Sequence, residues 1–325
     1  MKIHQRYKRF MPKVVGITAA VIVAFGVIML QIPSTKAASL HKKYQFIDTN
    51  YSIPSSNVAW VAPNGNDATG NGSENSPYKT FGKAVTAVPS GGTVVAKSGI
   101  YREPHFFVSK NNITLQAAPH AEVWLKGSDI VTNWTGDNGI WKTTGNYHNF
   151  CHVCTTNSDP GKEGVAAYPE QVFINDEPMQ QVATKAEVTP GSNTFYVEDK
   201  TPTTLKVPGD NSKGYNIGAQ DNITYYIGKN PAASQVEISE RPRAFTATGQ
   251  NFTARGVNVA QYASVQAWGF ADPVYGKDIS GPTAVSLNGN DSLVQNMIIT
   301  QNSNQGLFFN QAKASANGVK VIDNG

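Results

Sequence analysis

The sequence predicts an all-β chain, most of it a solenoid of short stacked strands. Charged residues are only 15% of the 325 residues, while 29 glycines and 18 prolines indicate many turns. Short strands entered through asparagine also recur along the chain, and stacking such strands buries their apolar side chains against neighbouring coils. The composition excludes a coiled coil or helical bundle, which need many Ala, Glu, Lys and Leu residues.

The N-terminus has the organisation of an export signal. Basic residues precede an apolar run at 14–30, and small residues follow at 35–38. This order of basic, apolar and small-residue regions is typical of a secretory signal. We therefore expect residues 1–37 to be a signal peptide and the rest to be secreted or displayed at the cell surface. The apolar run lies at the lower length limit of a membrane-spanning helix, so an uncleaved membrane anchor is the alternative. We expect contact with a membrane only through such an anchor.

The net charge of +4 belongs to the N-terminal segment. Residues 1–37 hold six basic residues and no acidic residue, so 21 basic and 23 acidic residues remain in the body. A body with a charge of −2 lacks the basic surface of a nucleic-acid-binding protein. We expect no nucleic-acid partner.

The only two cysteines, Cys151 and Cys154, lie close together. In a secreted protein this spacing favours a short disulfide. Half of a zinc site with His148 or His152 is the alternative, although its other ligands would have to come from distant segments. A c-type haem site is excluded because Thr155, not histidine, follows the second cysteine.

One helix is predicted near the start of the body. Apolar residues at 81, 84, 85 and 88 form a single helical stripe, Thr80 is a suitable N-cap, and Gly91 and Gly92 end the segment. We expect this helix to shield the open edge of the first coil. The preceding loop carries oxygen-bearing side chains that could circle calcium, but it lacks the spacing of a twelve-residue calcium loop, so a polar turn is favoured. These side chains are Asn64, Asn66, Asp67, Asn71 and Glu74.

The solenoid prediction depends on four similar stretches: 111–116, 250–259, 290–299 and 317–324. Each is a short strand associated with asparagine, which tolerates the left-handed conformation that corners need. We read these asparagines as a structural ladder. The distance from Asn290 to Asn317 suggests a repeat of 27 residues.

Residues 130–245 interrupt this pattern with strands of another kind, predicted at 171–174, 194–197, 204–207, 223–227 and 235–238. Asn175 and Asp176 form a predicted hairpin turn. We divide the body into an N-terminal cap with the first coils (38–129), an inserted β-sandwich-like module (130–245) and further coils (246–325). The sequence stops at a corner without a cap, so we expect a fragment whose C-terminal coils, including any catalytic ones, are missing.

Four N-terminal segments carry a resemblance: Val-Ala-Pro-Asn-Gly-Asn-Asp at 61–67, Ser-Pro-Tyr-Lys-Thr-Phe at 76–81, Lys-Ala at 83–84 and Gly-Ile-Tyr-Arg-Glu at 99–103. They resemble the N-terminal cap of secreted right-handed parallel β-helix proteins. That group includes pectate-lyase-like polysaccharide lyases and β-helix glycosidases that carry an inserted β-sandwich. Residues 169–178 resemble the insert of bacterial members. The resemblance implies a right-handed parallel β-helix that binds or acts on extracellular polysaccharide.

The resemblance does not identify a reaction. A lyase of this kind needs a base and a calcium ion held by converging carboxylates, and a glycosidase needs two opposed carboxyl groups. Asp272, Asp278, Asp291 and Asp323 are widely separated and suit turns instead. No cofactor is evident, and calcium is expected only for a lyase. We read Tyr101, Arg102 and Glu103 as structural, the last two as a surface pair.

One loop is a candidate glycan groove. Trp268 and Tyr275 offer aromatic faces to sugars, and Asp272 and Lys277 offer polar contacts; the alternative is a loop packed against the inserted module. The sequence therefore predicts an extracellular polysaccharide-active protein, either a lyase of uronate-containing glycans or a glycoside hydrolase. The alternative is a non-catalytic cell-surface protein that binds glycans or acts as an adhesin.

Overall fold

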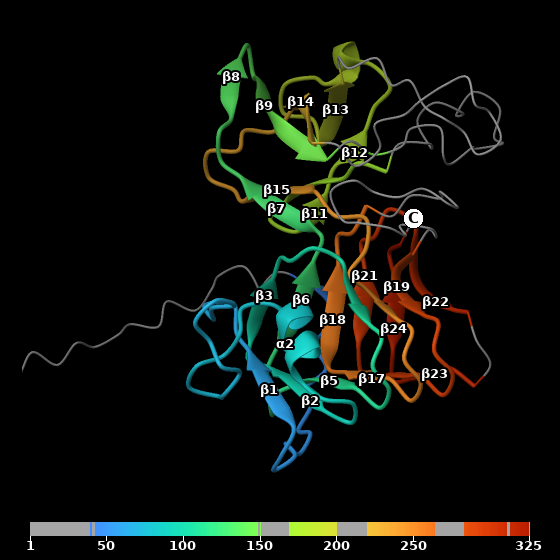
Figure 1. The fold of residues 1–325 in the computed structure, drawn as a ribbon. Coiled ribbons are helices and arrows are strands. Elements are labelled where there is room, and N and C mark those ends of the chain that lie inside the picture. Colours follow the sequence, from blue (N-terminus) through green and yellow to red (C-terminus); the bar gives the residue numbers. More distant parts are fainter. Residues whose placement is uncertain are drawn as a thin grey trace, which may run out of the picture. The chain divides into compact units, whose positions relative to one another are not determined.

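The computed structural model describes residues 40, 43–148, 150, 169–199, 220–263, 283–310 and 313–324. Several predicted features lie outside these residues: the signal peptide or anchor at 1–37, the pair Cys151 and Cys154, the strand at 204–207, and the groove residues Trp268, Asp272, Tyr275 and Lys277. The described residues form three parallel sheets and two largely antiparallel sheets (Figure 1).

Three parallel sheets form the faces of the solenoid, and in each sheet neighbouring strands come from different coils. The first contains β1 (Val58–Val61), β2 (Thr93–Ala96), β5 (Thr114–Ala117), β17 (Thr253–Arg255), β20 (Leu293–Gln295) and β23 (Ser315–Asn317). The second contains β3 (Gly99–Tyr101), β6 (Val123–Lys126), β18 (Val257–Ala260), β21 (Ile298–Thr300) and β24 (Lys320–Ile322). The third contains β4 (Phe106–Val108), β16 (Phe245–Ala247), β19 (Thr283–Leu287) and β22 (Gln305–Phe309).

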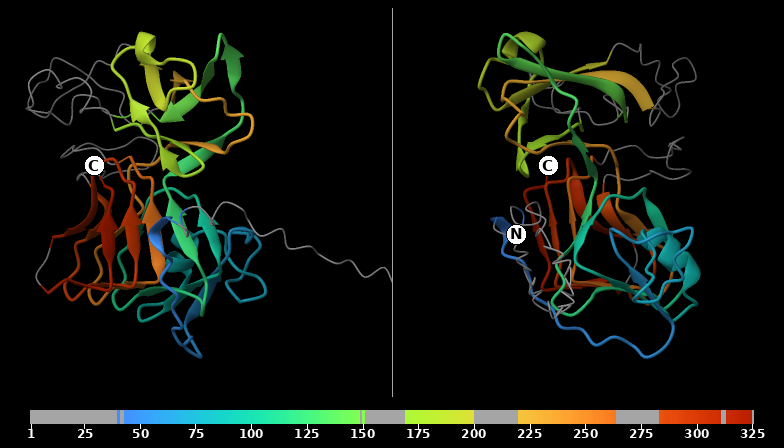
Figure 2. Two further views of the ribbon diagram at one scale, coloured as in Figure 1. Left: turned by 180° about the vertical axis from the view of Figure 1, so that it is seen from behind. Right: turned by 90° about the vertical axis from the view of Figure 1, so that its left-hand side faces the viewer.

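The stretches 250–259 and 290–299 are successive rungs, as the sequence predicts. Each holds two strands in different sheets, with a left-handed corner residue between them: Gly256 at φ 68° and Asn296 at φ 49°. Strand β17 pairs in parallel with β20, and β18 pairs in parallel with β21. The left view of Figure 2 shows the coils of this region, coloured orange to red, side by side.

Inward-facing side chains of successive coils stack in register. Leu115, Ala254 and Val294 are partners across β5, β17 and β20, and all three are fully buried. Such columns remove the apolar faces of short strands from water, at roughly 25 cal/mol for each Å² buried. A single coil has no interior of its own, so the stacking itself creates the core.

The predicted asparagine ladder is confirmed at the corner before the first sheet. Asn112 and Asn251 adopt left-handed φ angles of 59° and 53°, and Asn251 Nδ2 donates to Asn112 Oδ1 over 3.0 Å. The predicted 27-residue repeat is wrong. Leu293 pairs with Ser315, a step of 22 residues, because Asn317 ends β23 and pairs with Gln295.

Helix α2 (Phe81–Ala87) confirms the predicted helix. Thr80 Oγ1 accepts a hydrogen bond from the Lys83 backbone N–H, and Ala84 and Val85 are buried. The helix contacts β1, β2 and β4. Its role as a shield for the first coil stays a prediction. No helix in the part of the chain that the structure describes is both long and apolar enough to span a membrane.

Two further sheets lie between the coils in sequence. One contains β7 (Ser128–Val131), β10 (Val172–Ile174), β11 (Glu177–Pro178) and β15 (Val236–Ser239). The other contains β8 (Thr135–Asp137), β9 (Ile140–His148), β12 (Gln180–Gln181), β13 (Thr194–Asp199) and β14 (Gln220–Ile227), and a short helical turn, Lys185–Glu187, precedes β13. Their side chains form a separate apolar cluster that includes Val172, Phe195 and Tyr225.

The predicted hairpin turn is also confirmed. Ile174 and Glu177 pair across β10 and β11, and the two residues between them, Asn175 and Asp176, have φ angles of 53° and 64°. Two consecutive positive φ angles are typical of the tight turns that join hairpin strands. The turn brings the Asp176 side chain to the polar contacts described below.

Candidate functional site

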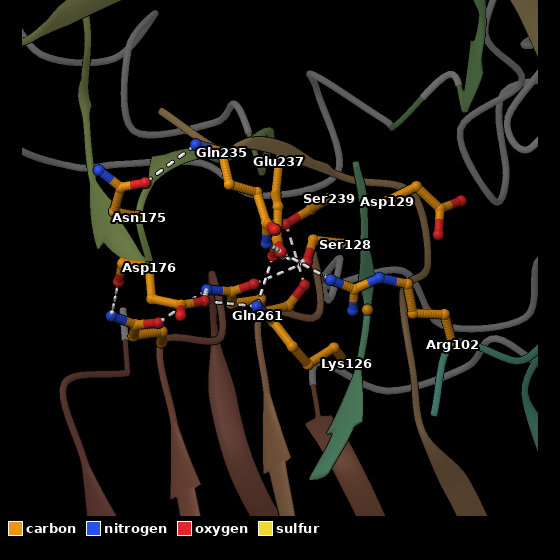
Figure 3. A network of polar contacts seen from close by, with 12 residues as sticks. Arg102, Lys126, Ser128, Asp129, Asn175, Asp176, Gln235, Glu237, Ser239 and Gln261 are labelled. Carbon is orange, nitrogen blue, oxygen red and sulfur yellow. Dashed lines mark hydrogen bonds and ion pairs between the residues drawn. The ribbon is translucent and has the colours of Figure 1, made fainter. Parts of the chain in front are cut away.

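A buried polar cluster connects the corners of the coils to the antiparallel sheets; we call it the polar junction. Its members are Arg102, Lys126, Ser128, Asp176, Glu237, Gln261 and Gln301 (Figure 3). The stacking of β6, β18 and β21 produces part of it, because Gln261 and Gln301 follow equivalent positions in β18 and β21. Gln261 Nε2 donates to Gln301 Oε1 over 3.0 Å.

Two cations and two carboxylates balance one another at the polar junction. Lys126 Nζ donates to Asp176 Oδ1 over 2.5 Å and also to Glu237 Oε2. Arg102 Nη2 donates to the other Glu237 oxygen over 2.6 Å. Figure 3 shows the Lys126, Asp176 and Glu237 side chains converging from three elements: β6, the hairpin turn and β15.

Hydrogen bonds from neutral groups complete the polar junction. Ser128 Oγ lies 2.8 Å from Glu237 Oε2 and 2.6 Å from Gln261 Oε1, and its one hydroxyl proton is donated to one of these two acceptors at a time. Gln301 Nε2 donates to the backbone carbonyl of Asp176 over 2.7 Å. These bonds satisfy groups that would otherwise be costly to bury.

The polar junction has a positioning role. Lys126, Glu237 and Gln261 have no exposed surface, and Asp176 is 3% exposed. A substrate arriving from solvent does not reach charges buried in this way. The junction instead fixes the antiparallel sheets against the coil corners. It thereby positions the two solvent-exposed hollows that are described below.

The predicted surface pair between Arg102 and Glu103 is wrong. Arg102 turns to Glu237, and Glu103 is only 4% exposed. The two Glu103 carboxylate oxygens accept the backbone N–H groups of Phe81 and Gly82, each over 3.0 Å, at the start of α2. Burial raises the pKa of Glu103 to about 7. Both residues are structural, as predicted, but with other partners.

Next to the polar junction lies a cavity of about 330 Å³ whose lining includes Asp129 and Glu240; we call it the carboxyl cavity. Asp129 forms a two-bond ion pair with Arg241, with N–O distances of 2.9 and 3.1 Å, and its side chain is 42% exposed. Glu240 is 8% exposed and accepts the backbone N–H of His148 over 2.9 Å.

The two carboxyl groups have contrasting environments. Burial is the main cause that raises the pKa of Glu240 to about 8, and the charge of Asp129 adds to it. Burial lowers the pKa of the neighbouring His148 to about 3, so its imidazole is neutral. At neutral pH the cavity therefore holds a protonated Glu240 beside a carboxylate that is paired with arginine.

A second hollow, of about 650 Å³, adjoins the carboxyl cavity, and both are lined by Ile130, Val131 and Thr132. Two half-buried indoles, Trp134 and Trp141, form part of its wall. We call it the tryptophan groove. Sequence analysis does not predict this groove, because the two tryptophans lie in a stretch without clear periodicity.

The described residues contain no cluster of carboxylates of the kind that holds calcium in a lyase. Among them no group of three or more His, Cys, Asp or Glu side chains is placed to hold a metal ion. The polar loop is a turn, as favoured: Asp67 Oδ1 accepts the backbone N–H groups of Lys79 and Thr80, and Asn66 Oδ1 accepts that of Ala68. The corner residues Asp291 and Asp323 have φ angles of 56° and 51°, which agrees with their reading as turn residues.

Similarity to solved structures is found at the level of the fold. No protein-family model matches this chain, and no curated protein matches its sequence. The structure is similar to the complex structure of XylC with xylose, with a TM-score of 0.50 and 18% identity over 76% of this chain and 43% of that chain. The chain therefore spans less than half of the length of that structure.

Two further structures are more distant. One is described as a glycoside hydrolase, with a TM-score of 0.46 and 10% identity over 79% of this chain and 68% of that one. The other is pectin methylesterase PemA from Erwinia chrysanthemi, with a TM-score of 0.33 and 10% identity over 80% and 46% of the two chains. The three parallel sheets and the similarity to XylC agree: the chain has the right-handed parallel β-helix fold that its N-terminal segments predict.

Proposed function

We propose that this chain is an extracellular polysaccharide-active protein of the glycoside hydrolase type, and that the carboxyl cavity holds the glycan. The observation that carries the proposal is the pairing of Asp129 and Glu240 in one cavity with different environments. Export is part of the proposal and rests on the order of basic, apolar and small residues at 1–37.

Glycoside hydrolysis uses two carboxyl groups in different protonation states. One donates a proton to the leaving oxygen, and the other acts as a base or a nucleophile on the opposite side of the sugar. Glu240 suits the acid, because burial keeps its proton at neutral pH. Asp129 suits the second role, because its side chain is 42% exposed and Arg241 stabilises its charge.

The ligand class has separate support. XylC, whose structure was solved with xylose, shares the fold. β-Elimination by a calcium-dependent lyase has less support, because the described residues contain no group of three or more His, Cys, Asp or Glu side chains placed to hold a metal ion. These observations favour hydrolysis over elimination for the described part of the chain.

The test is turnover of polysaccharides by the full chain and two variants. Release of reducing ends from neutral and acidic polysaccharides should fall about 100-fold or more in Glu240→Gln and in Asp129→Asn, the usual range for loss of acid–base catalysis. Glu198→Gln is the control, because this carboxyl lies on β13 and bonds to Tyr226 outside the cavity. Equal turnover in all four proteins would refute the proposal.

A second assay separates the reaction types. An unsaturated uronate product, detected by its ultraviolet absorbance and lost on addition of a chelator, would indicate a lyase instead. Retention of glycan without any turnover would indicate the non-catalytic binding protein. The tryptophan groove favours this second candidate function, since it offers binding surface without a reactive group.

A further inference from the structure

We propose that the tryptophan groove binds a stretch of neutral polysaccharide, and that it extends the glycan-binding surface from the carboxyl cavity across the antiparallel sheets. The inference shares with the proposed function only the class of ligand, since it requires no reaction. It rests on the shape, the chemistry and the rigidity of the groove.

The groove has the size and lining of a ligand site. Its volume of about 650 Å³ lies within the range of about 300–1,000 Å³ that is usual for small-molecule sites. Ile130 in its wall is 42% exposed, which makes it one of the few large apolar side chains in the described residues that face solvent to this degree. Most of its lining residues are apolar, among them Trp134 and Trp141, and a mainly apolar lining with a few polar groups is usual for ligand sites.

Both indoles are held in place before any ligand arrives. Trp134 Nε1 donates to the backbone carbonyl of Val131 over 3.0 Å. Trp141 pairs with Gly136 across β8 and β9, and its ring lies so close that a Cβ on Gly136 would come within 2.9 Å of it. Both rings also pack on the apolar cluster of the antiparallel sheets. Fixed aromatic faces lose little conformational freedom on binding.

The chemistry of the lining selects a neutral ligand. Among the described residues that line the groove none is Asp, Glu, Lys or Arg. Polar contacts come instead from groups such as the Thr132 and Ser234 hydroxyls and the Gln235 amide. Sugar rings present C–H faces that pack on indoles and hydroxyl groups that bond to amides and hydroxyls. A uronate or phosphate group would find no cation here to offset its charge.

Gln235 links the groove to the polar junction. Its Nε2 donates to Glu237, a member of the junction, and this bond fixes the Gln235 side chain in the wall of the groove.

The experiment measures retention of the full chain by neutral polysaccharides, such as xylan, β-glucan and mannan, and by polygalacturonate. We expect retention by at least one neutral polymer, little change on raising the salt concentration, and weaker binding to polygalacturonate. Trp141→Ala should weaken retention about tenfold or more. Gly136→Ala should weaken it to a smaller extent, because the added methyl group displaces the Trp141 ring without removing it.

Phe107→Ala is the matched control, because this exposed aromatic side chain lies on β4 of the parallel coils, outside the groove. Its retention and its melting temperature should equal those of the unchanged chain. Melting temperatures of the tryptophan and glycine variants check that the fold is kept; if Trp141→Ala fails to fold, Gly136→Ala decides alone.

The inference is overturned if no neutral polymer is retained, if salt abolishes retention, or if Gly136→Ala binds as well as the Phe107 control. These results are distinct from failure of the proposed function. A chain that retains neutral glycan through Trp141 but shows no Glu240-dependent turnover supports the groove and refutes the hydrolase.

Discussion

The Nζ atom of Lys126, at the end of β6, lies 2.5 Å from a carboxylate oxygen of Asp176 in the turn between β10 and β11, and both side chains are buried. This contact joins a coil of the parallel β-helix to a hairpin of the antiparallel sheets, 50 residues away in sequence. The charge pair is therefore part of the connection that sets the carboxyl cavity and the tryptophan groove beside the coils.

Removing the Lys126 ammonium should be costly. In Lys126→Met, Asp176 and Glu237 lose their shared cation inside the protein, and breaking a buried pair in this way costs about 3–5 kcal/mol. We expect the free energy of unfolding, measured with urea, to fall by that amount. The control is a more exposed ion pair next to the turn, between Lys43 and Glu177 of β11 over 3.0 Å. Lys43→Met should cost about 1 kcal/mol or less, and equal costs for both variants would contradict this account.

The free energy of unfolding should depend on whether the residue at an asparagine corner tolerates the left-handed backbone conformation. Asn251 has a φ of 53° and donates to Asn112. Asn251→Ala should lower the free energy of unfolding by about 1–2 kcal/mol, because alanine is strained in this conformation and the hydrogen bond is lost. Asn251→Gly should cost less, since glycine adopts the conformation freely. The opposite order in urea unfolding would argue against the corner geometry.

Glu103 should stabilise α2 from a neighbouring segment. Its two oxygens accept N–H groups that have no partner within the helix. Glu103→Ala should destabilise the protein by about 1–2 kcal/mol, as loss of an N-terminal cap does. Thr86→Ala, on the exposed side of the same helix, should change the free energy of unfolding by less than about 0.5 kcal/mol. A smaller effect at position 103 than at position 86 would refute this role.

Stability should decrease as the pH rises through the neutral range. Burial raises the pKa of Glu240 from its ordinary value of 4.5 to about 8, so the folded protein binds more protons than the unfolded chain between these values. By proton linkage, the free energy of unfolding then falls with rising pH in this window. Glu240→Gln should flatten this dependence in urea unfolding between about pH 5 and pH 8. An unchanged slope would show that Glu240 is ionised in the folded state.

Two histidines, the half-buried His105 and the buried His148, should lower stability on the acidic side. Burial lowers the pKa values of His105 and His148 from the ordinary 6.5 to about 3, so these rings stay neutral in the folded protein. The unfolded chain takes up the protons first, and stability should fall as the pH drops from about 6.5 toward 3. His105→Gln should reduce this loss, as followed by melting temperature across the acidic range. No change relative to the unchanged chain would be evidence against a neutral His105.

Local patterns in the sequence predict much of the fold. The helical stripe and the Thr80 cap predict α2, the asparagine corners predict the rungs, and Asn175 with Asp176 predicts the hairpin. Each of these depends on the conformational preferences of neighbouring residues. The 27-residue repeat fails because Asn317 ends a strand instead of opening a coil, and the identity of a residue does not tell these two positions apart.

The polar junction and the two hollows depend on contacts between distant segments. Lys126 and Glu237 are 111 residues apart, and Arg102 and Glu237 are 135 apart, so no local pattern joins them. Sequence neighbourhood predicts a pair between Arg102 and Glu103. In the folded chain Arg102 pairs with the distant Glu237 instead. The stacking of Gln261 on Gln301 could have been predicted from the sequence, because each glutamine lies two positions after a predicted rung stretch, 250–259 or 290–299.

The most direct test of the account is a crystal structure of the full chain soaked with a neutral oligosaccharide of the polymer that it retains. We predict a sugar stacked on the indoles of Trp134 and Trp141, with a hydroxyl group within hydrogen-bond distance of the Thr132 or Ser234 hydroxyl. A sugar found only elsewhere, for example at Trp268 and Tyr275, with the tryptophan groove empty, would contradict it.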